Sequence, residues 1–200
     1  MSRDILPPFS VTRPPDCTRR RSAASPARCS VSPRPPTETS SWPTPVLWPP
    51  PMLPADPVPT SVAVGPDGHY YVGELKGFPA PAGESNIWRV SPGASWAACG
   101  SSPDCVKVFD DGFTSIIDLA FDADGHLLVA ELDEASWLAV EVLGIVGGGT
   151  VNRCDTGTLT CGELATGIPI LTAITVGRDG VVWATRNALI PGLASVVGLD

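Results

Sequence analysis

Charged residues recur at one position of a repeated segment of this sequence. Each of three Asp-Gly pairs is followed, six residues after its glycine, by a charged residue: Glu74, Glu131 and Arg186. If the three line one face, their side chains could bind a metal ion or a polar ligand. The alternative is a solvated sheet edge, which is favoured because acids are common at exposed strand ends.

Asp118 is a fourth candidate for ligand binding. It begins a predicted strand at a position held by Ser61 and Ala173 in the other copies. A lone carboxylate pointing into a central channel could bind a divalent metal ion. Capping of backbone amides in an incoming loop explains the residue equally well. A divalent metal is therefore possible, although the sequence identifies no cofactor.

Two further patterns bear on chemistry. Asp122-x-Asp124-Gly125 resembles the start of a calcium loop, but the remaining spacing of such a loop is absent and a hairpin turn is favoured. No Ser/His/Asp order, phosphate loop or H-E-x-x-H motif occurs in the sequence. No residue is therefore assigned a catalytic role.

The repeated segment predicts the elements that position these residues. Its copies read SVAVGPDGHYYVGEL, DLAFDADGHLLVAEL and AITVGRDGVVWATRN, and their turn glycines are 57 and 55 residues apart. Each copy predicts a strand, a tight Asp-Gly turn and a second strand. Repeats of this length that contain hairpins are typical of β-propeller blades.

Side-chain size alternates along the first strand of each copy. One face carries the bulky pairs Val62/Val64, Leu119/Phe121 and Ile174/Val176, and the other carries small residues. We expect both faces to be buried, because small residues allow neighbouring blades to approach closely near the axis.

The sequence therefore predicts an all-β fold, a partial β-propeller of about three four-stranded antiparallel blades. The blades span about 56–113, 114–168 and 169–200, and the last is incomplete because no fourth strand remains. Open sheet edges leave unpaired backbone groups, so self-association through these edges is expected.

Residues 56–200 resemble the ScyD/ScyE family of secreted bacterial proteins related to NHL-repeat proteins. The resemblance is strongest in GELKGFP (73–79) and extends to IWRVSPG, FTSIIDLAFDADGHLLVAEL and ITVGRDGVVWATRN. It implies the C-terminal portion of a six-bladed propeller that is exported and has no established activity. A binding or scaffold role is the expected function. The alternative is a lactonase-like hydrolase, in which Glu74, Glu131, Asp118 and Asn187 contribute to a central metal site.

Four cysteines form two pairs at equivalent places, between the third and fourth strands of the first two blades. We predict the disulfides Cys99–Cys105 and Cys154–Cys161, because cysteines on facing hairpin strands can meet disulfide geometry. Zinc is a weaker alternative, since neither pair has C-x-x-C spacing. Disulfides indicate an oxidising compartment, and the family is secreted, although no signal peptide is visible in this sequence.

The composition changes near residue 56. Residues 1–55 hold more than half of the 23 prolines and predict a disordered tail rich in Pro, Ser and Arg. Residues 41–200 contain six basic and 18 acidic residues, which argues against a nucleic-acid partner. No apolar run is long enough for a transmembrane helix. The partners otherwise stay unknown.

Overall fold

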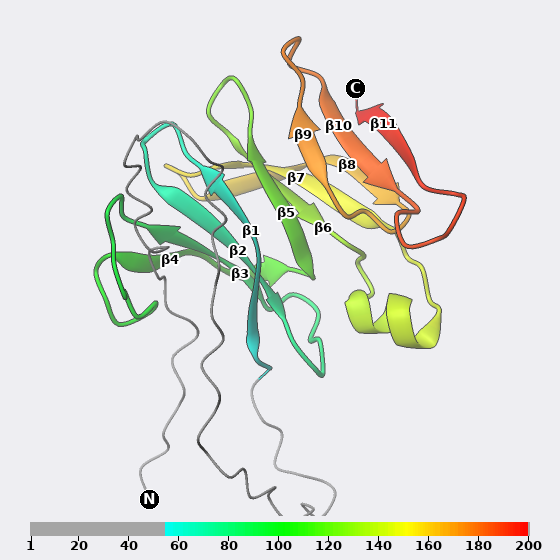
Figure 1. Cartoon of the computed structure of the whole chain (residues 1–200), viewed down its shortest axis with the longest axis horizontal. Helices are drawn as coiled ribbons and strands as arrows, with labels where there is room; N and C mark the ends of the chain where they lie inside the picture. Colours follow the sequence, from blue (N-terminus) through cyan, green and yellow to red (C-terminus); the bar gives the residue numbers. More distant parts are fainter. Residues whose placement is uncertain (1–54, 200) are drawn as a thin grey trace, which may run out of the picture. The chain divides into compact units, whose positions relative to one another are not determined.

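The computed structural model describes residues 55–199, which form three antiparallel β-sheets (Figure 1). The predicted all-β class is confirmed, and none of the sheets is closed on itself. The predicted tail, residues 1–55, lies almost entirely outside the described residues.

The three sheets follow one another along the chain. Sheet 1 contains β1 (Pro57–Val64), β2 (Tyr70–Lys76), β3 (Ser85–Val90) and β4 (Cys105–Phe113). Sheet 2 contains β5 (Ile116–Phe121), β6 (Leu127–Glu131), β7 (Gly149–Asp155) and β8 (Thr160–Ile168). Sheet 3 contains β9 (Ile174–Val176), β10 (Val182–Arg186) and β11 (Ser195–Leu199). Within each sheet, strands that are consecutive in the chain are hydrogen-bonded neighbours.

The Asp-Gly pairs form the predicted hairpin turns. Gly68, Gly125 and Gly180 have φ angles of 78°, 86° and 83°, which a residue with a Cβ atom rarely adopts. The strands on either side pair antiparallel: β1 with β2, β5 with β6, and β9 with β10. Local turn chemistry thus sets the start of every sheet.

The sheets pack face to face, and residues of their first two strands form much of each contact. In sheets 2 and 3, we call the face turned toward the preceding sheet the front face, and the opposite face the back face. In sheet 1, the front face is the equivalent one, which carries Val62 and Val64. Leu119, Leu127 and Val129 on the front face of sheet 2 share one core cluster with Tyr71 and Phe109 of sheet 1. The back face of sheet 2 packs on sheet 3 through a second cluster, which includes Leu128, Ala130, Ile174, Val182 and Ala184.

Small residues on the back faces let the sheets approach closely. Gly73 of β2 lies so near sheet 2 that a Cβ atom there would be 2.8 Å from Cγ2 of Ile116. Beside it, the rings of Tyr71 and Phe121 meet edge to face with their centroids 5.1 Å apart. At this contact, Gly73 leaves space for sheet 2 to approach, and the aromatic side chain of Tyr71 extends from sheet 1 to Phe121 of sheet 2.

The expectation that both faces of every first strand are buried is wrong for β1 and also for β9, whose Thr175 is exposed on the back face of sheet 3. Val62 and Val64 are 62% and 63% exposed, whereas the equivalent Leu119 and Ile174 are 6% and 7% exposed. The reason is that, in the part of the chain described, no sheet packs on the front face of sheet 1. Bulky and small side chains do alternate along β1, but no described sheet covers the face that carries Val62 and Val64.

Both predicted disulfides are present. The Cα atoms are 4.6 Å apart in Cys99–Cys105 and 4.1 Å apart in Cys154–Cys161. Cys99 and Cys105 also belong to a cluster with Val72, Trp88 and Val90. The β3–β4 connection thereby covers part of the front face of sheet 1 and leaves the end near Val62 and Val64 exposed.

The connection between β6 and β7 contains one short helical turn, η1 (Ala139–Leu143). Its sequence, AVEVL, is apolar except for Glu141, and in Figure 1 it projects beside sheet 3. None of the helices in the described part is long and apolar enough to cross a membrane.

Candidate functional site

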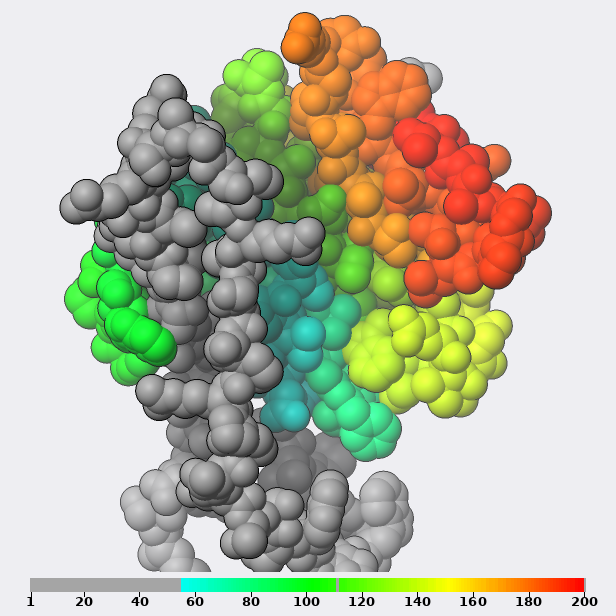
Figure 2. Space-filling model, viewed as in Figure 1, coloured from blue at the N-terminus to red at the C-terminus, as the bar shows by residue number. Residues whose placement is uncertain are grey.

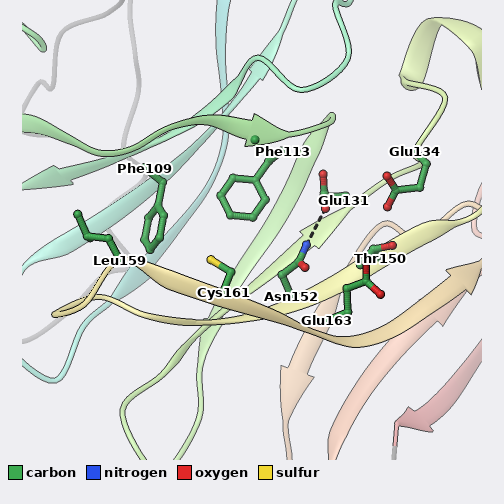
Figure 3. A pocket seen from close by; sticks show the side chains of 10 residues that line it. Phe109, Phe113, Glu131, Glu134, Thr150, Asn152, Leu159, Cys161 and Glu163 are labelled. Carbon is green, nitrogen blue, oxygen red and sulfur yellow. Dashed lines mark hydrogen bonds between the residues drawn. The ribbon is translucent and has the colours of Figure 1, made fainter.

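A groove opens between sheet 1 and sheet 2, where β4 faces β7 and β8 (Figure 3). Its volume is about 360 Å³. It is lined by aromatic, polar and acidic residues: Phe109, Gly112, Phe113, Glu131, Glu134, Thr150, Asn152, Leu159, Cys161 and Glu163. Figure 3 shows that the acids gather at one end of the groove, and Phe109, Leu159 and Cys161 at the other.

Glu131 lies at the acidic end and is 4% exposed. As the last residue of β6, it is placed by the strand that follows the Asp-Gly turn. Asn152 Nδ2 donates a hydrogen bond of 2.7 Å to one carboxylate oxygen, and the backbone N–H of Thr114 donates to the other. The carboxylate is thus held between β7 and the end of sheet 1.

The pKa of Glu131 is raised to about 7. Burial is the main cause, and the hydrogen bond from Thr114 opposes it. The nearby carboxylates of Glu134 and Glu163 raise the pKa further, since like charges disfavour ionisation. Three acids therefore share the groove, and one of them changes charge near neutral pH.

The groove suits a ligand with a positive charge next to an apolar portion. A cation at the acidic end would relieve the repulsion among the three carboxylates. Phe109 and Phe113, whose ring centroids are 5.9 Å apart, offer an aromatic wall for the apolar portion. A carboxyl with a pKa near neutrality could also transfer protons as a general acid or base.

Glu74, the counterpart of Glu131, lies outside this groove and is 0% exposed. It accepts hydrogen bonds from Asn86 Nδ2 at 3.1 Å and from Trp88 Nε1, and it forms an ion pair with Lys76. Burial of Glu74 and Glu131 excludes the solvated-edge interpretation for both. In sheet 1 the carboxylate joins β2 to β3 and neutralises a lysine.

Asp118 and Arg186 occupy different surroundings. Asp118 accepts hydrogen bonds of 2.9 Å from the backbone N–H groups of Leu119 and Ile174, so it links sheet 2 to the first residue of β9. This is the amide-capping arrangement expected as one of the two alternatives. Arg186 is exposed, and its Nε donates a hydrogen bond of 2.9 Å to Ser195 Oγ.

Glu74, Glu131 and Asp118 do not form a three-residue metal cluster. Within residues 55–199, only Asp122, Asp124 and His126 bring three ligand atoms within 4.8 Å of one another. Arg153 forms ion pairs with Asp122 and Asp124 at 2.6 and 2.7 Å. The carboxylates of this motif therefore hold an arginine on the next strand, in agreement with a hairpin turn.

The pKa of Asp122 reflects this arrangement. Burial, the largest single influence, raises it, but the hydrogen bonds from the His126 backbone and from Arg153 together hold it below its ordinary value. Asp122 also accepts a hydrogen bond of 3.0 Å from the backbone N–H of Asp124. The ionised carboxylate thus stabilises the turn.

Sequence reasoning singled out Glu131 and the disulfide residue Cys161 but not the rest of the groove. Glu134, Asn152, Glu163, Phe109 and Phe113 lie outside the hairpin repeat, on strands and a connection with no shared motif. The groove exists only because β4 of one sheet faces β7 and β8 of the next. In the sequence, the only feature that pointed to the acidic end of the groove was the equivalent position of Glu131 and Glu74 in the repeat.

No protein-family model matches the chain, and a search of curated proteins finds no significant match.

Proposed function

We propose that this protein is a secreted β-propeller-type binding module that takes a cationic ligand in the groove at Glu131. Treating the sheets as propeller blades is supported by three repeats of the same hairpin, by strand order within each sheet and by face-to-face packing of successive sheets. The resemblance to ScyD/ScyE proteins is part of the same proposal.

Secretion is supported by the two disulfides, which fit an oxidising, extracellular location. The Cys154–Cys161 bridge also has a local role, since Cys161 lines the groove. Because it joins β7 to β8, it fixes the wall that carries Asn152 and Glu163.

The observation that carries the binding proposal is the gathering of Glu131, Glu134 and Glu163 in one groove. Burial, together with the charges of Glu134 and Glu163, raises the pKa of Glu131 to about 7. A primary amine or guanidinium group would pair with the ionised acids, and its apolar portion would lie along Phe109 and Phe113. Binding should weaken as the pH falls below about 7, because protonated Glu131 no longer attracts a cation.

Calorimetric titration of the full chain with spermidine and with arginine methyl ester tests this proposal. We expect saturable binding at pH 8 that is at least about tenfold weaker at pH 5.5, a difference of about 1.4 kcal/mol. Glu131→Gln should abolish most of the binding, whereas Glu141→Gln, which changes an exposed acid on η1, should leave it unchanged. Equal binding by the two variants would refute the site.

A lactonase-like hydrolase is the second candidate, because a buried carboxyl with a pKa near 7 in a groove is suited to general acid–base catalysis. Its metal ligands would come from the acidic end of the groove. Lactone hydrolysis measured with added Ca²⁺, Zn²⁺ or Mn²⁺ separates the two candidates. Turnover that Glu131→Gln removes would favour the hydrolase over the binding module.

A further inference from the structure

Two faces of the sheet stack carry apolar side chains that no described sheet covers: the front face of sheet 1 and the back face of sheet 3. The first presents Val62, Val64 and Tyr70, which are 62%, 63% and 42% exposed. The second presents Trp183, which is 40% exposed, beside Thr175 and Gly198. We propose that these two faces dock on each other, head to tail, between two copies of this chain.

The front face of sheet 1 matches the front faces that are already buried. Relative to the turn glycines, Val62, Val64 and Tyr70 are equivalent to Leu119, Phe121 and Leu127 of sheet 2. They are likewise equivalent to Ile174, Val176 and Val182 of sheet 3. In sheets 2 and 3 these side chains pack on the preceding sheet. Sheet 1 thus has the residues of a packed face without its partner.

The back face of sheet 3 matches the surfaces that receive such residues. Thr175 and Trp183 are equivalent to Ala63 and Tyr71 of sheet 1 and to Ala120 and Leu128 of sheet 2. Ala63 and Tyr71 pack on sheet 2, and Ala120 and Leu128 pack on sheet 3. Figure 2 shows the orange and red atoms of sheet 3 along one side of the described part.

An internal contact provides the template for the docking. Tyr71 of sheet 1 meets Phe121 of sheet 2 edge to face. By position, the pair corresponds to Trp183 of one copy and Val64 of the next. An aromatic ring on the back face would again cover a bulky side chain on the front face, as Tyr71 covers Phe121.

The repetition favours a second copy over a different partner. Both halves of the interface are present on one chain, in the same order as in the two interfaces between its own sheets. Such a contact is heterologous, and it closes into a ring when the rotation between sheets allows it. Two copies would bring together six of the described sheets, which is within the range of four to eight blades of closed propellers.

The mass of the full, oxidised chain in solution, measured by sedimentation across a wide range of concentrations, tests the docking. We expect a dimer that dissociates on dilution. Val64→Asp and Trp183→Arg should each shift dissociation to at least about tenfold higher concentration. Both positions are exposed within the chain, so the variants should keep its fold.

Mixing the two variants gives the sharper readout. A Val64→Asp chain keeps an intact back face, and a Trp183→Arg chain keeps an intact front face. In a head-to-tail contact the mixture should therefore form heterodimers through one intact interface, although each variant alone is monomeric. In a symmetric contact that uses the same patch twice, mixing would restore nothing, and the proposal would be overturned.

Val142→Asp is the matched control, because Val142 is 66% exposed and lies on η1, which is part of neither face. It should dimerise as the wild type does, and dissociation of this variant would overturn the proposal. A wild-type monomer at all concentrations would do the same. The proposal would also be overturned if Val64→Cys were monomeric and its cysteine resisted thiol labelling, because another part of the same chain would then cover the front face of sheet 1.

Discussion

At the scale of residues, one repeated position has two different uses. Glu74 and Glu131 occupy equivalent positions in the second strand of a hairpin, near the end of β2 and at the end of β6, and both are buried. Glu74 is paired with Lys76 and accepts hydrogen bonds from its own sheet. Among the described residues, Glu131 has no comparable cation as a hydrogen-bond partner, and it lies near two further acids. The surroundings, rather than the strand position, make Glu131 the candidate for function.

The raised pKa of Glu131 makes the free energy of unfolding depend on pH. Between the ordinary value of 4.5 and about 7, the folded protein holds a proton that the unfolded chain has lost. This stabilisation is complete below about 4.5 and is lost as the pH rises to about 7. Relative to Glu131→Gln, the wild type should lose at most about 3 kcal/mol between pH 5 and pH 8.

Urea unfolding of both proteins at the two pH values measures this difference. Glu141→Gln serves as a control and should follow the wild type. If the wild type and Glu131→Gln respond to pH in parallel, the buried carboxyl does not titrate as described.

At the scale of elements, the hairpins could be predicted and the groove could not. Asp-Gly turns depend on glycine at positive φ, and strand alternation depends on side-chain size, so both are visible in the sequence. The disulfides were equally predictable, because both cysteine pairs span the same connection. The groove depends on how far β4 extends, to Phe113, and on how sheet 2 lies against it. Such contacts between sheets have no local sequence signal.

The start of β7 is another element that depends on contact between strands. A Cβ atom at Gly149 would be 2.1 Å from the backbone oxygen of Glu131 and 2.8 Å from that of Leu132. Backbone atoms cannot move aside as a flexible side chain can. Gly149→Ala should therefore destabilise the protein by about 1–3 kcal/mol and also disturb the groove at Glu131.

Thermal and urea unfolding measure the effect. Gly162→Ala is the matched control, since a Cβ atom at that position of β8 would have nothing within 4 Å. Equal stability of the two variants would show that β7 can shift without cost.

At the scale of the whole molecule, successive sheets use one packing rule. Bulky residues on the front face of one sheet pack against the back face of the preceding sheet. That back face carries small residues and one larger side chain, such as Tyr71 or Leu128. This rule explains why the prediction of buried faces failed at Val62 and Val64 of sheet 1 and at Thr175 of sheet 3, which face no further described sheet. The sequence shows which side chains share a face of a sheet, but their burial depends on whether a neighbouring sheet packs on that face.

If the two open faces dock between copies, stability should depend on protein concentration. The melting temperature of the wild type should rise with concentration, because association stabilises the folded state by mass action. The melting temperature of Val64→Asp should stay constant over the same range. Scanning calorimetry at several concentrations compares the two, and identical behaviour would argue against docking.

The packing rule also has an evolutionary consequence. Each hairpin repeat carries the same front face and the same back face, so a tandem duplication of about 55 residues would insert a new sheet between two existing ones. Both newly created contacts would use positions that already pack against each other in this chain. Deletion of one repeat would leave matching faces for the same reason. Genes of this kind can therefore gain or lose whole repeats more easily than they can change the surface of a single sheet.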